Sequence, residues 1–132
     1  MKIKLTTMYV NDQEQALRFY TETLGLVKKA DFTNGPFRWL TVVSPEDPEG
    51  TELQLAANSD PAAKAFQEHL YEGNRPAINF FTDDVQADYD RLAATGAEFK
   101  LGPTDTPGSK IVQLDDGCGN IVQITQLMSW SS

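Results

Sequence analysis

Polar side chains recur at alternate positions of several strand-like runs, and they are the residues of this chain that could do chemistry. In the run Glu52-Leu53-Gln54-Leu55 the Glu52 carboxylate and the Gln54 amide share one face, because successive strand residues point to opposite sides. A carboxylate can act as a general base when burial raises its pKa, and amides can orient a carbonyl or amide group of a ligand. The candidate ligand-binding residues are Thr7, Trp39, Glu52, Gln54, Asn79, Phe81, Gln113 and Gln123, and Glu52 is also the candidate catalytic residue.

Each of these assignments has an alternative interpretation. The polar face could be the solvent-exposed side of a sheet or a dimer interface instead of a binding site. Glu52 could be a solvated or hydrogen-bonded carboxylate. Trp39 and Phe81 could be core aromatics instead of a stacking surface for a planar or cationic ligand. Arg38 and Arg75 could meet an anionic group, although we expect both at the surface.

His69 and Cys118 are reactive residue types that we expect to play no part in the chemistry. His69 falls on a helix that connects the two halves of the chain and is expected at the surface. Cys118 lies between Gly117 and Gly119 in a run that favours an exposed turn, and no base is assigned beside it. A single cysteine also excludes an internal disulfide.

Short strands and three helices are expected to position the polar residues. The alternating pattern and the turn residues predict strands over 3–10, 26–32, 37–43, 51–56, 77–82, 98–101, 111–114 and 121–125, with a loop over 102–109. Capping residues predict helices that begin after Asp12, Asp60 and Asp84 and end before Gly25, near Tyr71 and before Gly96. The tail 128–132, which includes Trp130, is expected to fray.

The two halves of the chain repeat the same order of elements. Asp12 and Asp84 open helices that Gly25 and Gly96 end, and the strands around them match. We predict one domain over 1–132, made of a module at 1–58, a connector helix at 59–73 and a module at 74–127. Each module is βαβββ, which gives an α+β fold with curved mixed sheets around a cup and helices on the outer faces. The positions predicted to pack on the helices are Met8, Val10, Leu40, Val42, Leu53, Leu55, Ile78, Phe80, Val112, Leu114, Val122 and Ile124.

Charge and hydropathy exclude several classes of partner. The formal net charge of −8 argues against binding to a phosphate backbone, since that needs clustered Lys and Arg. No apolar run approaches the roughly 18 residues of a membrane span, and no hydrophobic signal segment follows Met1. We therefore expect a cytoplasmic domain that contacts neither nucleic acid nor a membrane.

The order and spacing of several motifs resemble the vicinal oxygen chelate superfamily, which includes glyoxalases, bleomycin resistance proteins and extradiol dioxygenases. The resemblance covers nearly the whole chain. The residues that carry it are Tyr9-Val10-Asn11-Asp12, Leu17-Arg18-Phe19-Tyr20, Leu24-Gly25, Glu52-Leu53, Asp83-Asp84-Val85, Arg91-Leu92, Gly96-Ala97-Glu98-Phe99 and Asp116-Gly117-Cys118-Gly119-Asn120 with Val122-Gln123.

The resemblance implies a cup that holds one divalent metal in the metal-dependent members. The four ligand positions of the family map to Leu5, Glu52, Ala77 and Gln123 in this sequence. Leu5 and Ala77 cannot ligate a metal, and two oxygens fall short of the three or four ligands that a zinc or iron site needs. We therefore expect no metal and no other cofactor, unless the mapping of Leu5 and Ala77 is wrong.

The function that the resemblance implies is binding of a small organic molecule in the cup, similar to the drug-sequestering resistance proteins, which are homodimers. The alternative is an enzyme. It would be a metal-assisted lyase, isomerase or dioxygenase of the same superfamily, or an enzyme that uses Glu52 as acid and base. A third interpretation is an accessory domain whose cup serves protein contacts.

Overall fold

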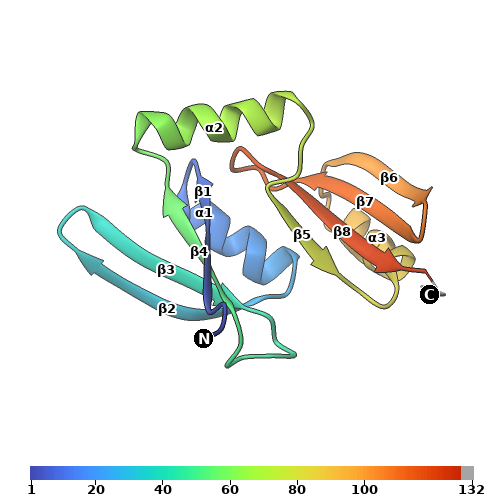
Figure 1. The fold of residues 1–132 in the computed structure, drawn as a ribbon, viewed down its shortest axis with the longest axis horizontal. Coiled ribbons are helices and arrows are strands. Elements are labelled where there is room, and N and C mark those ends of the chain that lie inside the picture. The colour runs from blue at the N-terminus through green and yellow to red at the C-terminus, as the bar shows by residue number, and fades with distance from the viewer. Residues whose placement is uncertain (129–132) are drawn as a thin grey trace. The chain divides into compact units, whose positions relative to one another are not determined.

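The computed structural model describes residues 1–128. Residues 129–132, which include Trp130, lie outside the described residues, and so does the prediction of fraying made for them. The elements follow the predicted order (Figure 1). They are β1 (Leu5–Val10), α1 (Gln13–Arg18), a π-helical turn (Phe19–Thr23), β2 (Val27–Asn34), β3 (Phe37–Val43), β4 (Glu52–Ala57), α2 (Pro61–Glu72), β5 (Ile78–Phe81), α3 (Val85–Ala94), β6 (Phe99–Thr106), β7 (Ser109–Asp115) and β8 (Ile121–Leu127). Within the described part of the chain no helix is long and apolar enough to cross a membrane.

The chain divides into two compact units, residues 1–68 and 69–132, and each contains one four-stranded mixed sheet. The strand order is β1-β4-β3-β2 in the first sheet, where β1 and β4 are parallel and the other pairs are antiparallel. The second sheet has the order β5-β8-β7-β6, again with its first pair parallel. This arrangement confirms the predicted α+β class and the two βαβββ modules.

The helices begin and end at the residues that the sequence indicated. Asp12 accepts hydrogen bonds from the backbone N–H groups of Glu14 (3.0 Å) and Gln15 (3.1 Å), which satisfies two donors in the first turn of α1. Asp84 caps α3 in the same way through the N–H of Ala87. A residue with positive φ follows each helical segment, Gly25 after the π-helical turn, Asn74 after α2 and Gly96 after α3.

The sheets contribute to the core through most of the apolar positions that alternation predicted, and helix residues such as Tyr20 and Leu92 complete it. Ile78 and Phe80 are partly exposed, and the other predicted positions are buried. The buried ones are Met8, Val10, Leu40, Val42, Leu53, Leu55, Val112, Leu114, Val122 and Ile124. The opposite face of each sheet therefore carries the polar side chains that were singled out as candidates.

The prediction of a loop over 102–109 was wrong. Strand β6 continues to Thr106, and the turn before β7 is only two residues long. The pairing of β6 with β7 shifts register twice, between Phe99 and Leu101 and between Leu101 and Thr104. Such bulges accommodate Gly102 and Pro103 within an edge strand, although both residue types are unfavourable inside regular strands.

The expectation of an exposed turn at Cys118 was also wrong, because its side chain is fully buried. The Asp116 carboxylate organises this loop from inside. It accepts hydrogen bonds from the backbone N–H groups of Cys118 (2.7 Å) and Asn120 (3.0 Å) and from the Asn120 amide nitrogen (3.1 Å). The backbone therefore wraps around the carboxylate, and the thiol turns inward.

Candidate functional site

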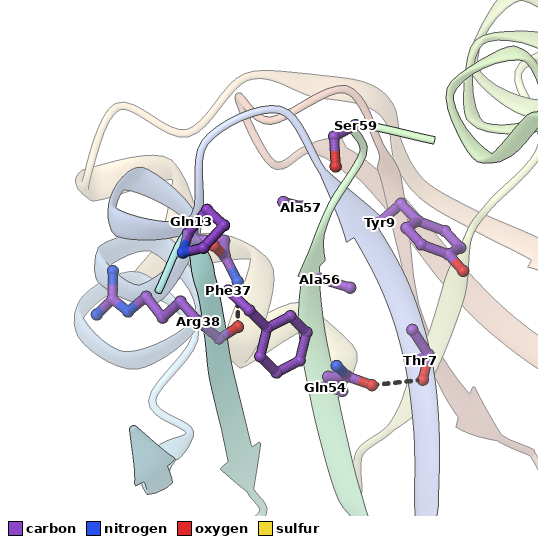
Figure 2. Close-up of a pocket in the computed structure, with 10 residues that line it drawn as sticks. Thr7, Tyr9, Gln13, Phe37, Arg38, Gln54, Ala56, Ala57 and Ser59 are labelled. Carbon is purple, nitrogen blue, oxygen red and sulfur yellow. Dashed lines mark hydrogen bonds between the residues drawn. The ribbon is translucent and has the colours of Figure 1, made fainter. Parts of the chain in front are cut away.

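A cavity of about 340 Å³ lies in the first unit (Figure 2). Its volume falls within the range of roughly 300–1,000 Å³ that is typical of small-molecule sites. The residues that line it are Thr7, Tyr9, Gln13, Pro36, Phe37, Arg38, Gln54, Ala56, Ala57 and Ser59. They come from β1, β3 and β4, from the start of α1 and from the segments beside these elements.

The cavity lies where β3 and β4 stop pairing. These strands are in register only at Thr41 with Gln54 and at Val42 with Leu53. The start of β3 and the end of β4 are not paired with each other. Phe37 and Ala57 line the cavity in this unpaired region. The cavity thus lies at the end of an incomplete ladder between these two strands.

The Gln13 side chain bridges the two strands where their ladder is missing. Its amide nitrogen donates to the backbone carbonyl of Arg38 on β3 (3.1 Å) and to that of Leu55 on β4 (2.9 Å). Gln13 is the first residue of α1, immediately after the Asp12 cap, so the start of the helix is fixed against both strands. One side chain therefore replaces part of the missing ladder and holds this wall of the cavity in place.

Gln54 brings a free hydrogen-bond donor to the cavity. Only 9% of its surface is exposed, and its amide oxygen accepts a hydrogen bond from the Thr7 hydroxyl (2.9 Å). Figure 2 shows the amide nitrogen on the side away from Thr7. Within residues 1–128 no protein group accepts a hydrogen bond from this nitrogen, which is open to solvent in the cavity. A ligand with an acceptor atom would satisfy it.

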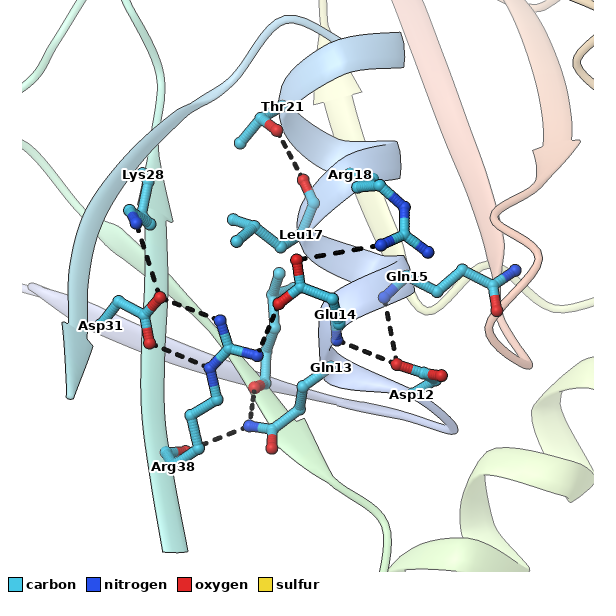
Figure 3. Close-up of polar contacts among 11 residues, drawn as sticks. Asp12, Gln13, Glu14, Gln15, Leu17, Arg18, Thr21, Lys28, Asp31 and Arg38 are labelled. Atoms are coloured by element: carbon cyan, nitrogen blue, oxygen red, sulfur yellow. Dashed lines mark hydrogen bonds and ion pairs between the residues drawn. The ribbon is translucent and has the colours of Figure 1, made fainter. Parts of the chain in front are cut away.

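Arg38 lines the cavity, but its charge is already compensated (Figure 3). The guanidinium makes two parallel hydrogen bonds of 2.9 Å to the Asp31 carboxylate and a third of 3.0 Å to Glu14. The hydrogen bonds from Arg38 hold the pKa of Asp31 below its usual value, and Asp31 in turn raises the pKa of Arg38. This arginine is therefore committed to its partners and is not a free anion receptor.

Two of the four predicted site residues in the first unit line the cavity, Thr7 and Gln54. Trp39 does not, but its ring stacks on Phe32 and lies 6.4 Å, centroid to centroid, from the ring of the cavity residue Phe37. Glu52 lies outside the lining and accepts a hydrogen bond from Thr41 (2.7 Å).

The predicted site residues of the second unit lie on its sheet, in a row of hydrogen-bonded side chains. The amide of Gln113 donates to Gln123 (2.9 Å), Gln123 donates to the Thr125 hydroxyl (3.2 Å), and Thr125 donates to Asn79 (2.8 Å). Phe81, on the same face as Asn79, is 62% exposed. These side chains form an ordered polar surface with an accessible aromatic ring beside it.

The four positions mapped to the family's metal ligands do not provide a set of metal donors. Leu5 lies beside Glu52 in the register of β1 and β4, so the Glu52 carboxylate has a hydrocarbon neighbour. In the second unit Gln123 lies beside Asn79, whereas Ala77 donates its N–H to the carbonyl of Ile121. Among residues 1–128 there is also no group of three or more His, Cys, Asp or Glu side chains that could hold a metal ion. The donors at these positions do not fit a zinc, nickel or iron ion.

Sequence reasoning missed several cavity residues. Tyr9 alternates with Thr7 along β1, so the period of two that identified Thr7 could also have found Tyr9. Gln13 and Phe37 carried no such signal, because they line the cavity only where β3 and β4 separate. Ser59, which follows β4, was likewise not visible as a site residue. The histidine at position 69 is exposed, as predicted.

Comparison with known proteins gives a consistent assignment. The model of the Glyoxalase/Bleomycin resistance protein/Dioxygenase superfamily matches residues 2–124. The chain is also similar to YurT, an uncharacterised protein of Bacillus subtilis (strain 168). The two are 47% identical over 126 residues, which cover 96% of this chain and 99% of YurT.

Two crystal structures resemble the chain over nearly its whole length. UcmS2 is 28% identical with a TM-score of 0.82, and the match covers 95% of this chain and 97% of UcmS2. TnmS3, described as an antibiotic binding protein from Streptomyces sp. CB03234, is 30% identical with a TM-score of 0.77, and the match covers 96% of both chains.

Proposed function

Since the chain belongs to the Glyoxalase/Bleomycin resistance protein/Dioxygenase superfamily, we propose that it binds a small organic molecule in the cavity of its first unit, without a metal ion. The observation that carries the proposal is Gln54, which is only 9% exposed and presents to the cavity an amide nitrogen that no protein group accepts a hydrogen bond from. No buried side-chain nitrogen or oxygen in residues 1–128 lacks a partner, so this nitrogen is open to solvent in the cavity, and the acceptor atom of a bound ligand would replace water there.

The comparison with TnmS3 supports binding as the function. That protein is described as antibiotic binding, and its match with this chain covers almost the full length of both. The donor chemistry at Leu5, Glu52, Ala77 and Gln123 supports the metal-free part of the proposal, because it leaves one carboxylate where a metal needs three or four ligands. The family resemblance also implies a homodimer, which sedimentation analysis would test.

A reaction that uses Glu52 as a general base receives less support. Glu52 is bonded to Thr41 and lies beside Leu5, and it is not among the residues of the cavity. A base must reach the proton that it removes, so a substrate in this cavity would lie away from the carboxylate. The variant Glu52→Gln separates the two functions, because it would abolish turnover by an enzyme and leave binding in the cavity unchanged.

Amide chemical shifts and melting temperatures, measured with a library of small aromatic and amide compounds, test the proposal. We expect bound compounds to shift the signals of cavity residues such as Thr7, Gln13 and Gln54, and to raise the melting temperature. Added zinc, nickel, manganese or iron(II) should leave the melting temperature unchanged. One tightly held metal ion per chain, or compounds that shift only residues outside the cavity, would contradict the proposal.

A further inference from the structure

The cavity carries no uncompensated charge, although the chain has a formal net charge of −8. Of the ten lining residues, Arg38 alone is ionised at neutral pH, and its guanidinium is bonded to both Asp31 and Glu14. A cationic ligand would find no lining carboxylate, and an anionic ligand would have to displace Asp31 from a two-point contact with Arg38. The electrostatics of the lining therefore favour an uncharged ligand.

The cavity also has one well-defined acceptor, the amide oxygen of Gln13. The orientation of this amide is fixed by its surroundings. Its nitrogen donates to the carbonyl groups of Arg38 and Leu55, and the reverse orientation would set three oxygen atoms against one another. No side chain or backbone group within residues 1–128 donates to the Gln13 oxygen, so it remains available to a ligand N–H or O–H.

A donor and an aromatic wall complete the recognition chemistry. The Gln54 amide nitrogen offers N–H groups to a ligand carbonyl. Phe37, whose side chain lines the same cavity, is 52% exposed and offers a flat apolar surface (Figure 2).

We infer that the cavity selects an uncharged, planar molecule with both a carbonyl acceptor and an N–H or O–H donor, of the kind found in aromatic lactams. The carbonyl accepts from Gln54, the donor is bound by Gln13, and Phe37 covers one face of the ring. This inference rests on the proposed function and names the class of ligand for it.

Four bicyclic probes of similar size separate charge from hydrogen bonding. They are isoquinolin-1(2H)-one, its N-methyl derivative, the N-methylisoquinolinium cation and the 2-naphthoate anion. Each is titrated into isotope-labelled protein at about 50 and about 500 mM salt, because salt screens charge–charge attraction and leaves neutral contacts almost unchanged. We expect the lactam to bind about tenfold more tightly than either ion, with less than about a twofold change between the two salt concentrations. The N-methyl derivative should lose roughly three- to tenfold in affinity, since it lacks the donor.

Variants test the two residues directly. The variant Gln54→Met removes the donor without adding charge, and it should weaken lactam binding about tenfold. Gln86→Met, on the exposed face of α3 in the other unit, is the matched control and should bind like the unmodified protein. Should Gln54→Met fold poorly, the comparison of the four probes on the unmodified protein still decides the question.

The possible results separate this inference from the proposed function. An ion that binds in the cavity more tightly than the lactam, with an affinity that falls as salt rises, would overturn the inference and leave small-molecule binding intact. Equal affinity for the lactam and its N-methyl derivative would show that Gln13 does not bind the hydrogen-bond donor of the ligand. If no probe and no compound of the broader library shifts a cavity residue, both the inference and the proposed function fail.

Discussion

Replacing Gln13 by methionine should destabilise the protein far more than its partly exposed position suggests. The two residues have similar length, so the change removes the amide group and little volume. It removes both hydrogen bonds from the Gln13 nitrogen, to the carbonyl groups of Arg38 and Leu55. These carbonyls lie where β3 and β4 no longer pair, and the strands offer no substitute donors there.

The size of the effect follows from the two lost contacts. A hydrogen bond within a protein contributes about 1 kcal/mol net, and a carbonyl left without a donor costs more when water cannot reach it. The adjacent cavity admits water, so the penalty should stay near the lower limit. We expect a loss of about 2 kcal/mol in the free energy of unfolding, which lowers the melting temperature by roughly 6 °C in a domain of this size.

Urea denaturation of Gln13→Met beside the control Gln86→Met, which loses only an exposed contact with Asp90, measures this loss. With a slope near 2 kcal/mol per molar urea, the midpoint should fall by about 1 M in the first variant and stay nearly constant in the second. A third variant, Gln13→Glu, should be the least stable at pH 7, because its carboxylate faces two carbonyl oxygens. It should recover part of the loss in acid, since protonation is favoured in the folded state and restores one donor. If Gln13→Met and Gln86→Met agree within about 0.5 kcal/mol, the bridging role of Gln13 is wrong.

Three further predictions concern the contacts around the site and the loop after β7. Because Arg38 lowers the pKa of Asp31, the pair stabilises the fold above the usual carboxyl pKa of 3.8, and this stabilisation is lost as the pH falls through the lower folded value. Asp31→Asn should therefore cost about 1 kcal/mol at pH 7 and progressively less as the pH falls below 3.8, as measured by urea denaturation across pH. Asp116→Ala should cost about 3 kcal/mol, since three N–H groups of a buried loop lose their acceptor; a loss below 1 kcal/mol would contradict the role given to this carboxylate. Cys118 is fully buried, so a thiol reagent should label it only when denaturant is present, and rapid labelling of the native protein would show that the loop opens.

The parts of the fold that sequence predicted correctly depend on neighbouring residues. Asp12 and Asp84 cap helices by bonding to residues two or three positions further on, so the signal and its effect lie within one turn. The buried faces of the strands follow from alternation alone, which is a local property as well. Thr7 and Gln54 were identified for this reason, as members of the polar face of adjacent strands.

The parts that sequence did not predict depend on contacts between distant segments. The cavity exists because β3 and β4 pair at only two positions, and nothing in either strand's own pattern indicates where the ladder stops. Gln13 has an ordinary place in the first turn of α1, and its role arises from carbonyl groups 25 and 42 residues away in the chain. Cys118 is buried because Asp116 gathers the loop around its carboxylate, which a run of glycines alone does not reveal.

The two modules differ at the positions where their internal repeat suggested equivalence. Counting from the helix caps pairs Leu5 with Ala77, and Leu5 does lie beside Glu52 in the first sheet. In the second sheet the residue beside Gln123 is Asn79, two positions beyond Ala77. Asn79 is joined to Gln123 through Thr125, so the second module has a continuous row of amides and a hydroxyl at the position where the first has a carboxylate and a leucine. Neutral hydrogen-bonding groups therefore occupy the polar face of the second module as well as the cavity of the first, and such groups are suited to orienting an uncharged ligand rather than to holding a metal ion.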